Sequence, residues 1–190
     1  CRRKCRYCAF VSWAARGSDL DTYLDHLVKE LGLWAKRLNR PRIETVFIGG
    51  GTPSCLSLSE VERMLEGLHS GFNLDPGLEV TLEANPESLW SRSELEQLHA
   101  GGVTRLSLGG QSFSDSALAW LGRGHTAAEI SRSVDRAVKA GIDSINLDLL
   151  FGLPGQTTPF WLSELERAIS HDISHLSCYG LTPEPGTPLG

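Results

Sequence analysis

The sequence predicts an α/β protein of parallel strands and intervening helices, and three observations support this class. Short apolar runs recur along the chain, most of them end at a segment rich in glycine or proline, and stretches with helical spacing of apolar residues lie between them. Strands that alternate with helices through short loops form parallel β/α units. The 190 residues are enough for one domain, 1–190, and too few for two of full size.

Strand-like segments are short and rich in β-branched and aliphatic residues. The predicted strands are 45–48, 78–82, 105–108, 144–150 and 175–181. A polar or glycine-rich motif stands at the end of each one. Because ligands of parallel β/α folds bind at the carboxyl edge of the sheet, we expect the chemistry of this protein to collect at that edge.

Helix-like segments are amphipathic, and several begin with recognisable signals. In the first, apolar residues from Leu20 to Trp34 follow each other at intervals of three and four. In the second, Ser57 and Glu60 have the spacing of a capping box. The predicted helices are 19–38, 57–68, 91–100, 127–140 and 159–171, with a further short helix between Gln111 and Arg123.

Composition excludes several classes of protein. The net charge is −5, and no basic run follows the first six residues, which argues against binding to a nucleic-acid backbone. No apolar stretch approaches the ~20 residues of a transmembrane helix. Three of the five cysteines fall within the first eight residues. An odd number in this arrangement disfavours a disulfide framework and points to metal or redox chemistry in a reducing, cytoplasmic setting.

Cys1, Cys5 and Cys8 form the pattern C-x3-C-x2-C. Thiolates at such short spacing can converge on one metal centre. A structural zinc site needs four protein ligands, and no fourth cysteine or histidine lies nearby, whereas three cysteines on a four-iron cluster leave one iron open to an outside ligand. Zinc and redox-sensing thiols remain the alternatives. The other two cysteines, Cys55 and Cys178, are predicted to be small buried side chains.

The cysteine triplet followed by a glycine-rich strand end resembles the radical S-adenosylmethionine (SAM) superfamily, in which the open iron binds the methionine part of SAM. Six segments in order also resemble the oxygen-independent coproporphyrinogen III oxidase-like family. They are 49–54 (GGGTPS), 83–87 (EANPE), 105–113 (RLSLGGQSF), 121–125 (LGRGH), 146–157 (NLDLLFGLPGQT) and 181–189 (LTPEPGTPL).

The resemblance implies a partial (β/α)6 radical SAM barrel with parallel strands and outer helices, and with the first strand and the C-terminal region missing. It implies a 4Fe-4S cluster on the three cysteines, and SAM across the carboxyl ends of the strands. Gly50, Gly51 and Thr52 would contact SAM through a backbone that approaches the ligand closely; a tight turn into a capped helix is the simpler interpretation. Glu83 matches the carboxylate that holds SAM in the family, and Tyr7 would line the same pocket or cover the cluster.

Gln111, Arg123 and Asp148 match oxidase positions that contact SAM, in one case a second copy of it. A carboxylate at the end of an apolar strand is costly to bury unless it is paired or used. The structural alternative is an ion pair of Arg123 with Asp148 or Glu83. His125 follows in the same loop and is expected to be structural or solvated. No residue is assigned a catalytic role.

Phe10 distinguishes two branches of the family. The oxidases extend the triplet to C-x3-C-x2-C-x-C, but Phe10 stands at the position of that last cysteine. This is similar to the HemW branch, whose members are described as chaperones that bind heme and deliver it to acceptor proteins. The alternatives are a SAM-dependent coproporphyrinogen III oxidase, which needs an electron donor, and a structural zinc module. Arg2, Arg3, Lys4 and Arg6 would either balance an anionic cluster or form a solvated face.

Overall fold

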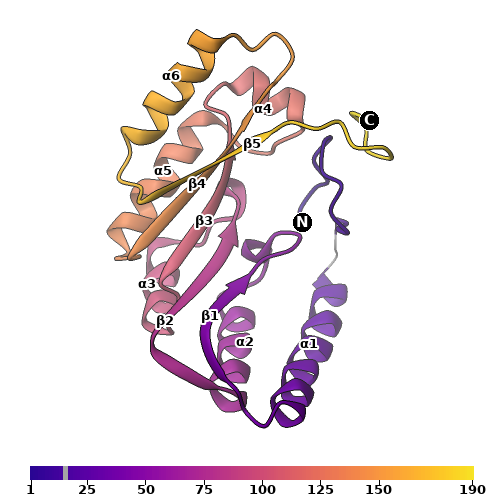
Figure 1. Cartoon of the computed structure of the whole chain (residues 1–190), viewed down its shortest axis with the longest axis vertical. Helices are drawn as coiled ribbons and strands as arrows, with labels where there is room; N and C mark the ends of the chain where they lie inside the picture. The colour runs from indigo at the N-terminus through magenta and orange to yellow at the C-terminus, as the bar shows by residue number, and fades with distance from the viewer. Residues whose placement is uncertain (15–16) are drawn as a thin grey trace.

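The computed structural model describes residues 1–14 and 17–190 (Figure 1). Its strands are β1 (Arg42–Ile48), β2 (Asn73–Ala84), β3 (Arg105–Gln111), β4 (Ser144–Phe151) and β5 (His175–Gly180). Its helices are α1 (Gly17–Arg37), α2 (Leu58–Gly71), α3 (Arg92–Ala100), α4 (Asp115–Leu121), α5 (Ala127–Lys139) and α6 (Thr158–Ile169), with short 3-10 helices η1 (Pro53–Cys55) and η2 (Pro86–Ser88). The predicted strands and helices are confirmed, although β1 and β2 begin earlier than expected.

The described strands form one sheet in the order β1-β2-β3-β4-β5, and each neighbouring pair is parallel. The sheet is curled, with helices along its outer side (Figure 1). The predicted α/β class is therefore confirmed, and the arrangement is that of a partial β/α barrel. The N-terminal segment and the C-terminal end lie close together, and Leu189 N donates a hydrogen bond to Arg6 O at 3.0 Å.

Side chains alternate between the two faces of each strand, and this separates the core from the site. On β2 the side chains of Leu82 and Ala84 are buried in the main apolar cluster with residues of the helices, whereas Glu83 between them faces the other way. On β4 Leu147 belongs to the core, whereas Asp148 lines the inner face. The outer face therefore carries the packing, and the inner face is left for polar groups.

Capping boxes begin three of the helices that follow strands. In each, the N-cap hydroxyl accepts from the backbone N–H three residues later, and the glutamate there accepts from the N-cap backbone; the pairs are Ser57–Glu60, Ser91–Glu94 and Thr126–Glu129. A cap of this kind stabilises a helix by about 1 kcal/mol. The local sequence thus determines where α2, α3 and α5 begin.

The prediction that both remaining cysteines are buried is wrong. Cys178 is exposed and Cys55 is half-buried. Cys178 lies on β5, the last strand in the sheet order, where four of six residues are exposed because the described chain covers this strand poorly. Cys55 ends η1 and lines the pocket described below.

Within residues 1–14 and 17–190, no helix is long and apolar enough to cross a membrane.

Candidate functional site

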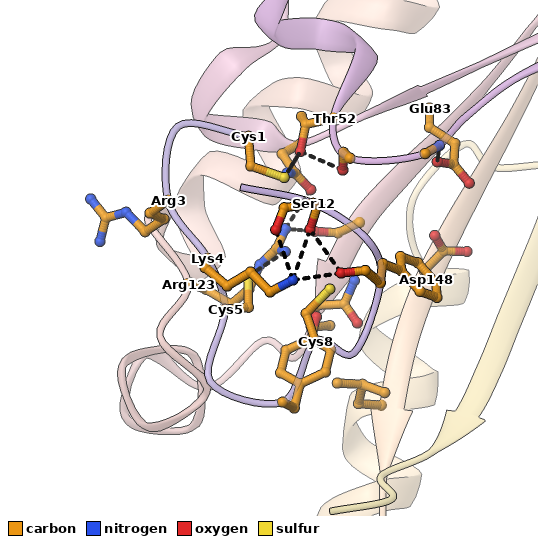
Figure 2. A pocket seen from close by; sticks show the side chains of 18 of the residues that line it. Cys1, Arg3, Lys4, Cys5, Cys8, Ser12, Thr52, Glu83, Arg123 and Asp148 are labelled. Atoms are coloured by element: carbon orange, nitrogen blue, oxygen red, sulfur yellow. Dashed lines mark hydrogen bonds between the residues drawn. The ribbon is translucent and has the colours of Figure 1, made fainter. Parts of the chain in front are cut away.

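A cavity of about 470 Å³ lies between the carboxyl ends of the strands and the N-terminal segment. All eleven residues predicted for the site line it, and Figure 2 shows several of them pointing toward one another. They are Cys1, Cys5, Tyr7, Cys8, Gly50, Gly51, Thr52, Glu83, Gln111, Arg123 and Asp148. The structure thus brings together groups that lie up to 147 positions apart, from Cys1 to Asp148.

The three N-terminal cysteines have free, half-buried thiols, and two of them receive hydrogen bonds from other parts of the chain (Figure 2). Thr52 Oγ1 lies 3.2 Å from Cys1 Sγ, and Arg123 NH1 lies 3.4 Å from Cys5 Sγ. Between Cys5 and Cys8 the backbone makes a turn, closed by Cys8 N donating to Cys5 O at 3.3 Å. The three cysteines therefore line the cavity, and the sulfurs of Cys1 and Cys5 have polar donors beside them.

Among the described residues, no three side chains of His, Cys, Asp or Glu are placed to hold a metal ion together. A four-iron cluster has a different requirement, because each of its cysteines binds a different iron.

Lys4 connects the first part of the cysteine segment, residues 1–14, to its later part. Its Nζ donates to Phe10 O at 2.5 Å, to Ser12 O at 2.9 Å and to Ser12 Oγ at 3.1 Å. An ammonium group has three donors, so these contacts use all of them. Arg2 and Arg6 donate instead to the backbone oxygens of Glu87 and Trp120. These three cations therefore fix the segment and are more than a solvated face.

Glycines after β1 allow a close approach to Glu83. Gly50 has φ +122°, in the region that favours glycine, and its N–H donates to Glu83 Oε2 at 3.1 Å. A Cβ on Gly49 would lie 2.8 Å from the Phe47 ring and 2.9 Å from Glu83 Oε2. The glycine-rich segment thus forms a cradle against the carboxylate.

Two carboxylates of the pocket form no ion pair with any described residue. Burial raises the pKa of Glu83, and the hydrogen bond from Gly50 offsets this only in part. Burial also raises the pKa of Asp148, against hydrogen bonds that include one from Asn146 Nδ2 at 2.7 Å. The charge of Arg105 also opposes the shift at Asp148, although the two side chains form no ion pair. Partly buried acids with raised pKa values are typical of ligand sites.

Arg123 is the buried cation of the site, with 9% of its surface exposed. It does not form the ion pair with Asp148 or Glu83 that was the structural alternative. Its NH2 donates to Asn85 Oδ1 at 2.6 Å and to Gly109 O at 2.7 Å, while its Nε has no partner among the described residues. Buried charges are normally paired. The Glu87 carboxylate supplies part of the countercharge, and the position of the guanidinium beside Cys5 fits a second anionic group in the pocket, such as a thiolate-bound cluster.

Two further pocket residues have unusual environments. Gln111 ends β3 with φ +71° and is buried; such a conformation is uncommon outside glycine and concentrates at functional sites. Burial raises the pKa of Tyr7 to about 12, although the nearby Arg123 guanidinium opposes the shift. The phenol of Tyr7 is therefore a neutral group on the cavity wall.

His125 is structural, as expected for a lone histidine. Its side chain is fully buried, with Nδ1 2.8 Å from Glu87 Oε2 and Nε2 3.0 Å from Gly110 O. Burial by itself would raise the pKa of Glu87, but the hydrogen bond from His125 and the Arg123 charge lower it to about 2. The pair connects η2 to the loop after α4, and Glu87 itself lines the cavity.

Asn85 is the site residue that sequence reasoning missed. It lines the cavity just after β2 and contacts both Thr52 and Arg123. Its position two residues after Glu83, at the carboxyl edge of the sheet, was the available signal. Its partners are 33 and 38 positions away, so the sequence alone did not reveal them.

The fold and the cysteine-lined cavity define a class of protein. The model of the radical SAM superfamily matches residues 1–159, and the chain belongs to this superfamily. The family implies a 4Fe-4S cluster and SAM as cofactors.

Similar proteins with curated names indicate which members of the superfamily this chain resembles. Over its whole length the chain is 40% identical to the heme chaperone HemW of Escherichia coli (strain K12), and over 98% of its length 37% identical to that of Bacillus subtilis (strain 168). It is also 39% identical to the mouse "Radical S-adenosyl methionine domain-containing protein 1, mitochondrial" and covers 42% of it. The chain spans about half the length of the HemW proteins, 50% and 49%.

Among solved structures, 97% of the chain superposes on 43% of the coproporphyrinogen III oxidase HemN of Escherichia coli, described as a radical SAM enzyme. The TM-score is 0.88 at 28% identity. The predicted resemblance to the coproporphyrinogen III oxidase-like family is confirmed, because the chain is similar both to HemW heme chaperones and to the oxidase HemN.

Proposed function

We propose that Cys1, Cys5 and Cys8 bind a 4Fe-4S cluster and that SAM binds beside it in the cavity. The observation that carries this proposal is the convergence of the three thiols with the buried guanidinium of Arg123 on one cavity, where Arg123 NH1 donates to Cys5 Sγ at 3.4 Å. An anionic cluster beside Cys5 would add to the negative charge that Glu87 already places near Arg123. When bound, the cluster and SAM supply one-electron chemistry, which belongs to the cofactors and not to the protein.

The residues of the cavity have complementary roles toward SAM in this proposal. The carboxylate of Glu83 accepts from the ammonium group of its methionine part, and the segment from Gly50 to Thr52 offers backbone and hydroxyl groups to it. Gln111 and Asp148 lie on the wall formed by β3 and β4 and contact the remainder of the ligand. Tyr7 closes the cavity on the cysteine side.

We further propose that the whole protein is a heme chaperone, which binds heme and delivers it to acceptor proteins in a reducing compartment such as the cytoplasm. Support comes from 35–40% identity to HemW proteins from several bacteria over nearly the whole chain. Phe10 adds to it, because it replaces the last cysteine of the oxidase pattern and has 69% of its surface exposed on the cysteine segment.

A coproporphyrinogen III oxidase is the second candidate. The observation that favours it is the similarity of backbone to HemN, with a TM-score of 0.88 over 97% of the chain. This activity requires cleavage of SAM and therefore an external electron donor.

Anaerobic reconstitution tests the cluster. The wild-type chain should bind about four irons. Cys5→Ala should lose the cluster and keep its far-UV circular dichroism, whereas the matched Cys178→Ala, an exposed cysteine outside the cavity, should keep the iron. Binding of one zinc per chain, or normal iron content in Cys5→Ala, would contradict the assignment.

Two assays on the full-length protein separate the candidates. A heme chaperone should bind heme stoichiometrically and transfer it to an apo acceptor, without converting coproporphyrinogen III in the presence of SAM and a reductant. Sustained turnover of coproporphyrinogen III would reverse the order of the two proposals. The Phe10→Cys variant measures whether restoring the oxidase pattern confers any turnover.

A further inference from the structure

Asn85 joins the two residues that contact the cysteines. Its Nδ2 donates to Thr52 Oγ1 at 3.1 Å, and its Oδ1 accepts from Arg123 NH2 at 2.6 Å. The orientation of this amide follows from chemistry, because a guanidinium has only donors and must face the oxygen. Both ends of the side chain are thus used, each toward a different part of the chain.

The identity of Asn85 is not explained by helix capping. It occupies the N-cap position of η2, where asparagine is a preferred residue, yet its side chain makes no capping hydrogen bond within the described chain. Its backbone N–H donates to Ser54 Oγ at 3.0 Å, which fixes the residue independently of its side chain. The side-chain amide is therefore available for hydrogen bonds to other residues of the site.

Thr52 and Arg123 connect Asn85 to the sulfurs of Cys1 and Cys5. Thr52 accepts from Asn85, so its own proton is left for Cys1 Sγ at 3.2 Å or Gly51 O at 2.7 Å. Arg123 donates to Cys5 Sγ at 3.4 Å through NH1 while NH2 is held by Asn85. When Thr52 donates to Cys1 Sγ, a chain of hydrogen bonds runs from Cys1 to Cys5 through the single amide of Asn85.

We propose that Asn85 is a positioning residue for the cluster: it holds Thr52 and Arg123 where they donate hydrogen bonds to the sulfurs of Cys1 and Cys5. The inference rests on the proposed cluster binding. Hydrogen bonds to cluster sulfurs set the reduction potential, because they stabilise the reduced, more negative state. Partners of this kind also orient the ligands and affect retention of the metal.

The test compares Asn85→Leu, which removes both hydrogen bonds at similar size, with Asn85→Ser, a smaller change that keeps a good N-cap residue. Asn73→Leu is the matched control, because Asn73 lies at the other end of β2 and its side chain donates to Arg40 O, away from the cavity. Each reconstituted chain is measured for iron and sulfide, for midpoint potential by an EPR-monitored redox titration, and for iron loss to a chelator.

Both Asn85 variants should bind the cluster with a more negative midpoint potential and lose iron about tenfold faster than wild type. Asn73→Leu should match wild type. Thr52→Val should have a smaller effect on the potential in the Asn85→Leu background than in wild type, because the two residues act in one chain.

The outcomes separate this inference from the proposed function. Failure of the wild-type chain to bind iron would overturn the cluster and the inference with it. A fully loaded cluster of unchanged potential and retention in both Asn85 variants would overturn the inference alone. An equal effect of Asn73→Leu would also overturn it, since general loosening of β2 would then explain the result.

Discussion

Replacing Glu87, a residue of the cavity wall, by glutamine tests the electrostatics of the site. The pKa of Glu87 is lowered to about 2 from 4.5, so ionised Glu87 stabilises the fold above pH 4.5, and this stabilisation is lost as the pH falls toward 2. A shift of this size corresponds to about 3.5 kcal/mol at most, since each unit is worth ~1.4 kcal/mol. The side chain retains 16% exposure to solvent, and with screening by solvent and salt we expect about 2 kcal/mol.

The assay is urea unfolding of wild type and Glu87→Gln from pH 6 to pH 3.5. The difference in unfolding free energy should be about 2 kcal/mol at pH 6 and about 1 kcal/mol at pH 3.5, because the carboxylate then protonates more readily in the unfolded chain than in the folded one. Glu96→Gln is the control, since it removes an exposed ion pair with Arg92 and should cost at most about 0.5 kcal/mol. A difference for Glu87→Gln that stays constant or grows toward low pH would refute the reasoning.

Three further predictions concern the fold around the site. Glu164→Leu should destabilise the protein by about 1–3 kcal/mol in urea unfolding, because the buried carboxylate accepts from Phe113 N, whereas Glu164→Gln should cost less; equal losses would argue against the hydrogen bond. Ser91→Ala should cost about 1 kcal/mol through loss of the α3 capping box, and an unchanged melting temperature would contradict this. Gly50→Ala should destabilise the fold by about 1 kcal/mol and weaken SAM binding measured by calorimetry, since φ is +122° there; unaltered stability and affinity would be evidence against the cradle.

Local signals predicted the elements of this fold well. The spacing of apolar residues in α1, and the serine and glutamate of α2, involve neighbours three or four positions apart, whose geometry a helix sets by itself. The same holds for the alternation on β2 and β4, which separates core from site. The start of β2 was misplaced, because pairing of Asn73 with Arg42 depends on a neighbouring strand and not on local pattern.

Tertiary structure decided the partners of the site residues. The sequence identified Arg123 as a residue of the cavity, but its contact with Asn85 and not with Asp148 or Glu83 depends on how the loop after α4 approaches β2. Exposure of Cys178 likewise depends on its strand being last in the sheet.

The sequence by itself therefore determined the class of fold, the superfamily and eleven of the residues that line the cavity, because motifs at the carboxyl ends of parallel strands must meet at one edge. Only the tertiary structure decided which of those residues touch. Hydrogen bonds between segments 33 or more positions apart, such as those of Asn85, depend on sheet curl and loop path, and no local pattern carries that information.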